Sequence, residues 1–155
     1  MDVKYVNPFI NAIVNTMETM MDVSPNRGTP YLKGEHSTQG DISSVIGFAG
    51  KHVSGSVALS FPLPVALKIY SLMMGETVYR ITNDVQDVVG EIANIVAGAA
   101  KAEMSEQGLS FDLSIPTVVV GKGHRIGCKI DVPIMVIPME IGKHRFVMEI
   151  TMKLK

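Results

Sequence analysis

The sequence has few of the residues on which several familiar kinds of site depend. It contains no tryptophan and a single cysteine, Cys128, and aromatic residues make up only 6% of its 155 positions. One cysteine cannot form a disulfide within the chain, and the lack of a disulfide framework weakly favours a reducing compartment. We interpret Cys128 as a small residue in a strand rather than as a nucleophile.

Charge of either sign is also sparse. Charged residues make up 19% of the chain, and 14 basic against 15 acidic side chains leave a net charge of -1. The basic residues are scattered, so no cluster is long enough to follow a phosphate backbone. We therefore expect no nucleic-acid partner.

Long apolar runs are absent as well. No segment offers the roughly 18 consecutive apolar residues that a membrane-spanning helix needs. The start of the chain, residues 1–5, lacks the basic region followed by an apolar run that marks a secretory signal. These absences predict a soluble, cytoplasmic protein that does not enter a membrane.

No metal-binding or common catalytic motif is recognisable. The four histidines show no ligand spacing among themselves or with the cysteine, so we expect no metal site; they are His36, His52, His124 and His144. The glycine-rich segment 121–127 lacks the Lys-Ser/Thr pair of a phosphate-binding loop and is better interpreted as a hairpin loop. No nucleophile elbow of a serine hydrolase is present.

The composition predicts a folded protein. With 46% apolar residues the chain is too apolar for disorder, and its length fits a single domain, 1–155, with a sizeable core. Apolar spacing and helix boundary residues predict helices at about 7–22, 62–75 and 82–108. Alternating patterns predict strands at 31–36, 42–49, 53–61, 111–120, 125–139 and 144–154.

This order of elements predicts an α+β fold, with helices packed on a largely antiparallel β-sheet. The strands 42–49 and 53–61 are close enough to form a hairpin across residues 50–52. Each half of the chain pairs a helix with a hairpin, which hints at an internal duplication.

The third helix carries the most informative pair of residues. Its apolar residues recur at steps of three and four and predict one buried stripe: Val85, Val88, Val89, Ile92, Ile95, Val96 and Ala99. At about 100° per residue, Glu91 and Asn94 lie roughly 60° apart and well over a quarter turn from the centre of that stripe. A carboxylate and a carboxamide are therefore expected side by side on the solvent face.

The surroundings of this pair carry little side-chain bulk. Asp87, Gly98 and Lys101 share the exposed face, and Gly90 and Ala97 flank it, so another protein could lie close against the helix. No lysine or arginine stands three or four residues from the glutamate, which is expected to be unpaired within its own helix. Spacing alone leaves open that both polar side chains are merely solvated.

Residues 90–101 resemble the signature helix of the CheC/CheX/FliY family of chemotaxis phosphatases, in Gly90-Glu91-Ile92-Ala93-Asn94 and Ala97-Gly98-Ala99-Ala100-Lys101. The likeness extends to Tyr5-Val6-Asn7-Pro8-Phe9-Ile10, to Gly55-Ser56-Val57-Ala58-Leu59-Ser60-Phe61-Pro62 and to Leu113-Ser114-Ile115-Pro116-Thr117-Val118. A single copy of the Glu-x-x-Asn motif is typical of the CheX branch of the family.

The resemblance implies a CheC/CheX-like fold and a hydrolase that removes the aspartyl phosphate from CheY-like response regulators. It assigns Glu91 to pairing with a lysine of the receiver domain, and Asn94 to positioning the attacking water. It implies that Mg²⁺ is bound by the regulator and that this chain binds no cofactor. The pathway would be chemotaxis or another two-component system.

The resemblance also implies a homodimer formed through sheet edges, with strand 125–139 or strand 144–154 as the edge. Pro133 and Pro138 make the former harder to place in the centre of a sheet. Two alternatives to a phosphatase stay open. The chain could be a non-catalytic adaptor of a flagellar switch or signalling assembly, or the face around Glu91 could be a helix–helix seam between copies.

Overall fold

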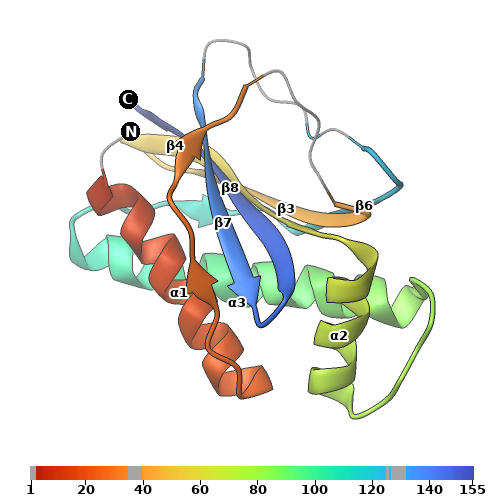
Figure 1. The fold of residues 1–155 in the computed structure, drawn as a ribbon. Coiled ribbons are helices and arrows are strands. Elements are labelled where there is room, and N and C mark those ends of the chain that lie inside the picture. The colour runs from red at the N-terminus through yellow and green to blue at the C-terminus, as the bar shows by residue number, and fades with distance from the viewer. Residues whose placement is uncertain (1–2, 35–39, 125, 127–131) are drawn as a thin grey trace.

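The computed structural model describes residues 3–34, 40–124, 126 and 132–155. Within these residues, three helices cover one face of a single eight-stranded sheet (Figure 1). Every pairing between neighbouring strands of this sheet is antiparallel. The predicted α+β fold is therefore confirmed.

The helices are α1 (Val3–Met21), α2 (Leu63–Met74) and α3 (Asn83–Glu106). The strands are β1 (Asn26–Arg27), β2 (Tyr31–Leu32), β3 (Ile42–Ala49), β4 (Val53–Phe61), β5 (Asp112–Leu113), β6 (Thr117–Val120), β7 (Ile134–Ile141) and β8 (His144–Leu154). Across the sheet the strand order is β1-β7-β8-β4-β3-β5, with β2 also paired to β7 and β6 to β3. The order of the elements along the chain agrees with the predicted pattern, although the suggested internal duplication stays a prediction.

The main boundary errors occur at prolines. Helix α1 begins at Val3 rather than at Asn7, and Pro8 lies inside it. Because only about one turn precedes Pro8, its missing N–H removes a single hydrogen bond near the start of the helix, where proline is tolerated best. The predicted strand 111–120 is divided into β5 and β6, with Pro116 between them, since proline cannot donate to a strand ladder.

The expectation that 144–154 forms a sheet edge is wrong. Strand β8 is hydrogen-bonded to β7 on one side and to β4 on the other, so its backbone has no free edge. Strand β7 has β8 on one side and the two-residue strands β1 and β2 on the other. Cys128, and most of the predicted strand before β7, lie outside the described residues.

The core lies between the sheet and the helices. Alternate residues of β3, β4 and β8 face the helices, including Ile46, Leu59 and Ile150, which have exposed fractions of 0–1%. Phe9 of α1 stacks against Phe48, with ring centroids 5.7 Å apart. Helix α3 lies beneath the sheet and packs against α1, and this position determines which of its residues reach solvent (Figure 1).

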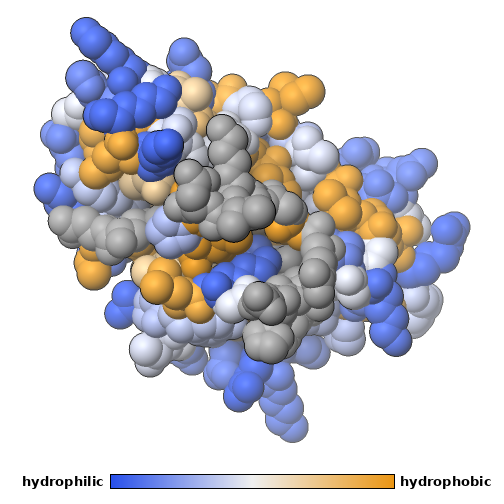
Figure 2. Space-filling model, turned by 90° about the horizontal axis from the view of Figure 1, so that it is seen from above, coloured by the Kyte–Doolittle hydropathy of each residue, from blue (hydrophilic) through white to orange (hydrophobic). Residues whose placement is uncertain are grey.

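The opposite face of the sheet carries an ion pair. Figure 2 looks onto this face, where apolar and polar side chains alternate over short distances. Lys33 and Glu149 are 12% and 6% exposed, and their charged atoms approach to 2.9 Å. The pair ties the segment after β2 to the middle of β8.

Candidate functional site

Helix α3 begins at a conventional cap. The Thr82 side-chain oxygen accepts a hydrogen bond from the backbone N–H of Val85 at 3.2 Å, and Asp84 lies in the first turn. A hydroxyl at this position satisfies one of the donors left free at the helix start, and a carboxylate there interacts favourably with the helix dipole. The cap therefore sets where the helix starts.

The buried side of α3 determines the face that it presents to solvent. The buried residues are Val85, Val89, Gly90, Ile92, Ala93, Val96, Ala97, Ala100 and Met104. Compared with the predicted stripe, burial shifts towards the alanines: Val88 and Ile95 are only half-buried, and Ala99 is exposed. Small residues are preferred where α3 is closely packed, and the larger side chains beside them remain partly in solvent.

Glu91 and Asn94 both lie on the exposed side of α3. They belong to a stripe with Asp84, Asp87 and Gly98, at the steps of three and four that place residues on one face of a helix. Among the described residues, no side chain forms a hydrogen bond or ion pair with either of them. A carboxylate and a carboxamide thus stand next to each other, free to meet groups of another molecule.

Two of the residues expected to flank this pair are buried. Ala97 has no exposed surface and belongs to the core. Gly90 lies beneath Pro116 and the start of β6, where an added Cβ would be 3.4 Å from a methyl of Val118 and 3.9 Å from the ring of Pro116. Gly90 and Ala97 therefore support the packing of α3 and do not offer surface to a partner.

The other three expected residues are accessible to different degrees. Asp87 and Gly98 are exposed, whereas Lys101 is half-buried and its ammonium group lies 3.9 Å from the Asp112 carboxylate of β5. Gly98 has open space around it, because nothing lies within 4 Å of a Cβ built on it. Packing within this chain therefore gives no reason for glycine at this position.

The structure also places together residues that sequence reasoning did not connect. The Ser43 hydroxyl lies 2.8 Å from that of Ser60 and 2.6 Å from Nε2 of His124. Nδ1 of this imidazole is 2.6 Å from the carbonyl oxygen of Gly121, to which it donates. The alternating patterns of β3 and β4 place both serines among the residues that face away from the apolar side of the sheet. That Ser43 lies opposite Ser60 could not be predicted, because it depends on how the two strands pair.

This serine–histidine chain lacks the properties of a hydrolase site. Ser43 and Ser60 are 0% and 1% exposed, so a substrate cannot reach their hydroxyls. A carbonyl, rather than a carboxylate, stands behind the imidazole and offers no charge to stabilise its protonated form. We interpret the chain as a structural link between the 121–124 turn and the sheet.

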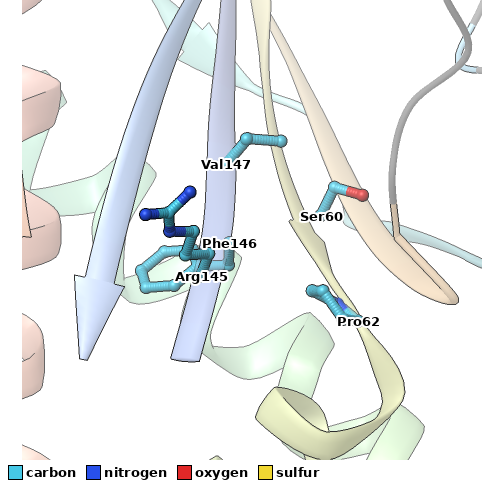
Figure 3. Close-up of a pocket in the computed structure, with 5 residues that line it drawn as sticks. All are labelled: Ser60, Pro62, Arg145, Phe146 and Val147. Atoms are coloured by element: carbon cyan, nitrogen blue, oxygen red, sulfur yellow. The ribbon is translucent and has the colours of Figure 1, made fainter. Parts of the chain in front are cut away.

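A small hollow adjoins Ser60 at the end of β4 and the start of β8. It has a volume of about 90 Å³ and is lined also by Pro62, Arg145, Phe146 and Val147 (Figure 3). Pockets for small-molecule ligands usually enclose about 300–1,000 Å³. The hollow is therefore too small for a metabolite.

Two other kinds of site receive no support from the described part of the chain. No group of three or more His, Cys, Asp or Glu side chains is arranged to hold a metal ion among the described residues. None of the described helices combines the length and the hydropathy that crossing a membrane would require.

Comparison with known proteins identifies relatives across nearly the whole chain. The profile of a family described as "Chemotaxis phosphatase CheX" matches residues 42–140. The CheY-P phosphatase CheX of Thermotoga maritima is 30% identical over 144 residues, which cover 90% of this chain and 92% of that protein. The match includes the segment that contains the exposed pair.

Solved structures agree with this relationship. A CheC-like superfamily protein from Shewanella sp. PV-4 is 35% identical and superimposes with a TM-score of 0.93, over 99% of both chains. The chemotaxis protein CheX from Vibrio vulnificus is also 35% identical, with a TM-score of 0.91 over 97% of this chain and 99% of that one. The arrangement of helices and sheet described above is therefore shared with these proteins.

The open space around Gly98 gives a first prediction. Replacing Gly98 by alanine should raise the free energy of unfolding by about 0.5–1 kcal/mol, because alanine loses less backbone entropy in a helix and meets no neighbour here. Urea denaturation followed by circular dichroism measures the change. Gly55→Ala is the contrasting control, because its Cβ would collide with the Thr151 carbonyl oxygen and should destabilise the protein. An unchanged or lowered stability of Gly98→Ala would contradict the prediction.

Proposed function

The chain belongs to the CheX family of chemotaxis phosphatases, and on this premise we propose that it hydrolyses the aspartyl phosphate of a CheY-like response regulator. The observation that carries the proposal is the exposure of Glu91 and Asn94 side by side on α3, without partners among the described residues. Neither side chain is needed to complete the fold of its own chain. Both are positioned to enter the phosphorylation pocket of another protein.

The proposed reaction needs few groups from this chain. In the proposed reaction a water molecule attacks phosphorus, the bond between phosphorus and the aspartyl oxygen breaks, and inorganic phosphate leaves a free carboxylate behind. The receiver domain binds Mg²⁺ and contributes a lysine, which together stabilise the charge on the transferred phosphoryl group. What this chain must add is the position of the water.

Asn94 is suited to that task by its amide group. A carboxamide accepts a hydrogen bond through its oxygen and donates through its nitrogen, so it can orient water without changing its own charge. Holding the water in line with the bond to be broken converts a rare arrangement into the usual one, which is a large source of rate acceleration. Asn94 therefore acts mainly on kcat.

Glu91 is suited to docking. Its carboxylate, one helical turn before Asn94, pairs in the complex with the lysine of the receiver and fixes the register of the two proteins. Asp87 and Gly98 extend the same exposed stripe on either side, and the lack of a side chain at Gly98 lets the partner approach the helix backbone. Burial of Gly90 and Ala97 removes them from this contact surface.

We also place the protein in the cytoplasm, where response regulators act, and expect a homodimer. Since β8 is interior, the sheet edges that could pair are those formed by β1 with β2 and by β5 with β6. All four strands are short, which limits the length of ladder that either edge offers. Sedimentation velocity at micromolar concentration should give the mass of two chains, and a monomer would contradict this expectation.

The function is tested with a panel of receiver domains charged with acetyl phosphate. Phosphate release should accelerate for at least one receiver, and Asn94→Ala should lower kcat at least about 10²-fold because the water is no longer held in line. Asn94→Asp is a second variant of the same size, which lacks the amide donors and places a negative charge beside the phosphoryl group. Ser105→Ala, another exposed position on α3, is the control and should keep full activity.

The same assay separates catalysis from adaptor binding. Asn94→Ala should still bind the receiver charged with beryllofluoride, so loss of turnover cannot be attributed to loss of the complex. Full activity of Asn94→Ala would show that the proposed role is wrong. A wild-type protein that binds the receiver but releases no phosphate would favour the adaptor.

The docking role of Glu91 gives a separate prediction. Reversing its charge in Glu91→Lys should weaken association with the receiver at least about tenfold, because two ammonium groups would then face each other. Isothermal titration calorimetry with the beryllofluoride-charged receiver measures the affinity. Glu106→Lys makes the same change on the same helix, about 22 Å further along its axis, and should leave binding unaltered. Equal affinities for the two variants would remove the pairing from the proposal.

A further inference from the structure

An apolar hollow lies near the N-terminal end of α3, away from Glu91 and Asn94. It has a volume of about 460 Å³. Its apolar wall comes from three parts of the chain: Leu63 at the start of α2, Tyr79 and Ile81 in the link between α2 and α3, and Val120 at the end of β6. The hollow is large enough to receive one or two side chains of another protein.

Three of these apolar side chains are exposed to solvent rather than packed in the core. Tyr79 is 86% exposed, Val120 47% and Leu63 36%. Large aromatic side chains that project into solvent beside a hollow are typical of the anchors around which protein interfaces form. Within the described residues, nothing in this chain covers Tyr79.

The segment that carries Tyr79 is fixed to the body of the protein. Val78 and Ile81, on either side of it, pack against the core. At the start of the segment the Tyr70 hydroxyl donates to the Glu76 carboxylate at 3.2 Å, and burial together with this neighbouring carboxylate raises the pKa of Tyr70. Tyr79 is therefore a projection held between anchored residues.

A second depression lies between the hollow and the exposed stripe of α3. Arg80 and Ile81 also line this depression, which includes Thr82, Asn83 and Asp84 at the start of the helix. Asp84 belongs to the stripe that contains Glu91, and seven residues of helix separate the two by about 10 Å along the axis. Strand β6, which ends at Val120, lies against α3 at Gly90.

Basic groups stand at the rim of the hollow. Arg80 and Lys122 are exposed there. The one carboxylate among the described lining residues, that of Asp41, accepts a hydrogen bond from the backbone N–H of Leu63 at 2.6 Å and so is engaged at the start of α2. The rim therefore favours a partner surface that combines an apolar side chain with acidic ones.

We propose that this hollow is a second contact for the same receiver domain that Glu91 and Asn94 engage, and that it takes an apolar side chain flanked by carboxylates beside the phosphorylation pocket. The proposal rests on the proposed function. A pocket that holds Mg²⁺ is built from carboxylate oxygens, so acidic residues are expected around it. The positive charges of Arg80 and Lys122 complement these acidic residues, while Glu91 pairs with the lysine of the receiver domain.

The surface area that a specific complex buries supports a second contact near the start of α3. A stable interface buries about 800 Å² on each partner, which corresponds to a disc of about 16 Å radius. A disc of that radius centred on the exposed pair includes the start of α3, about 10–15 Å away along the helix axis. A receiver that covered only Glu91 and Asn94 would form a smaller contact than most specific complexes have.

The experiment compares two exposed tyrosines. Tyr79→Ala should raise KM for the phosphorylated receiver about tenfold and leave kcat within twofold of wild type, because the anchor contributes to docking and does not touch the reacting atoms. Tyr31→Ala is the matched control, since Tyr31 is 52% exposed on β2 at the far edge of the sheet, and its KM should equal that of wild type. Thermal unfolding of both variants should match wild type because neither side chain is buried.

The charge at the rim is tested in the same assay. Arg80→Glu should raise KM by at least as much as Tyr79→Ala. It should also weaken the dependence of kcat/KM on salt concentration, measured between about 50 and 500 mM, because salt then screens less of an attraction between the two proteins. The Asn94→Ala variant, measured in parallel, should lose kcat instead. The two contacts would thus separate into one that binds and one that positions water.

The possible outcomes distinguish this proposal from the function on which it rests. If wild type accelerates phosphate release and Tyr79→Ala has the KM of wild type, the hollow is not a receiver contact and the function stands. If Tyr79→Ala instead changes the sedimentation coefficient, the hollow belongs to an interface between copies, and the proposal is wrong. If no receiver is dephosphorylated by wild type, both proposals fall together.

Discussion

The candidate site depends on one constraint, the rotational orientation of α3 about its own axis. Val89, Ile92 and Val96 have no exposed surface because they are packed between the sheet and the other helices. A rotation of one residue, about 100°, would bring polar groups into this core, where a carboxylate or carboxamide without a partner is costly. The apolar stripe thus holds Glu91 and Asn94 outward more firmly than any hydrogen bond to the pair could.

The convex shape of the candidate site limits the kind of substrate on which it can act. Small-molecule sites are concave and enclose most of their ligand, whereas the exposed pair stands on the outer surface of a helix. The reacting group must therefore arrive inside a cavity that belongs to the other protein. This shape agrees with the proposed function, in which a phosphorylated receiver domain would contribute the pocket, the metal ion and the phosphoryl group, and this chain would contribute two side chains at a fixed spacing.

Local patterns predicted the parts of the structure that depend on neighbours in sequence. The α2 and α3 boundaries, the β3–β4 hairpin and the outward direction of Glu91 and Asn94 all follow from spacing of three to four residues in a helix or two in a strand. Apart from the boundaries near Pro8 and Pro116, what failed depends on pairing between distant segments. The interior place of β8, the burial of Gly90 under Val118 and the contact of Ser43 with His124 each require the order of strands in the sheet, which periodicity does not contain.

The two proposed contacts have different effects on the geometry of the complex. A single ion pair at Glu91 fixes one point of the receiver but leaves it free to turn about that point, and catalysis by position tolerates only about 0.5 Å and 10–20° of misplacement. A second contact beyond the start of α3, which itself lies about 10 Å from Glu91 along the helix axis, restricts this rotation: at a distance of about 10 Å, a slack of about 1 Å corresponds to a turn of about 6°. An anchored Tyr79 therefore favours the correct orientation when the two proteins dock, which lowers KM, while Asn94 itself positions the water in the complex that forms. On this argument the apolar hollow belongs to the docking surface, although every one of its residues lies outside the signature helix.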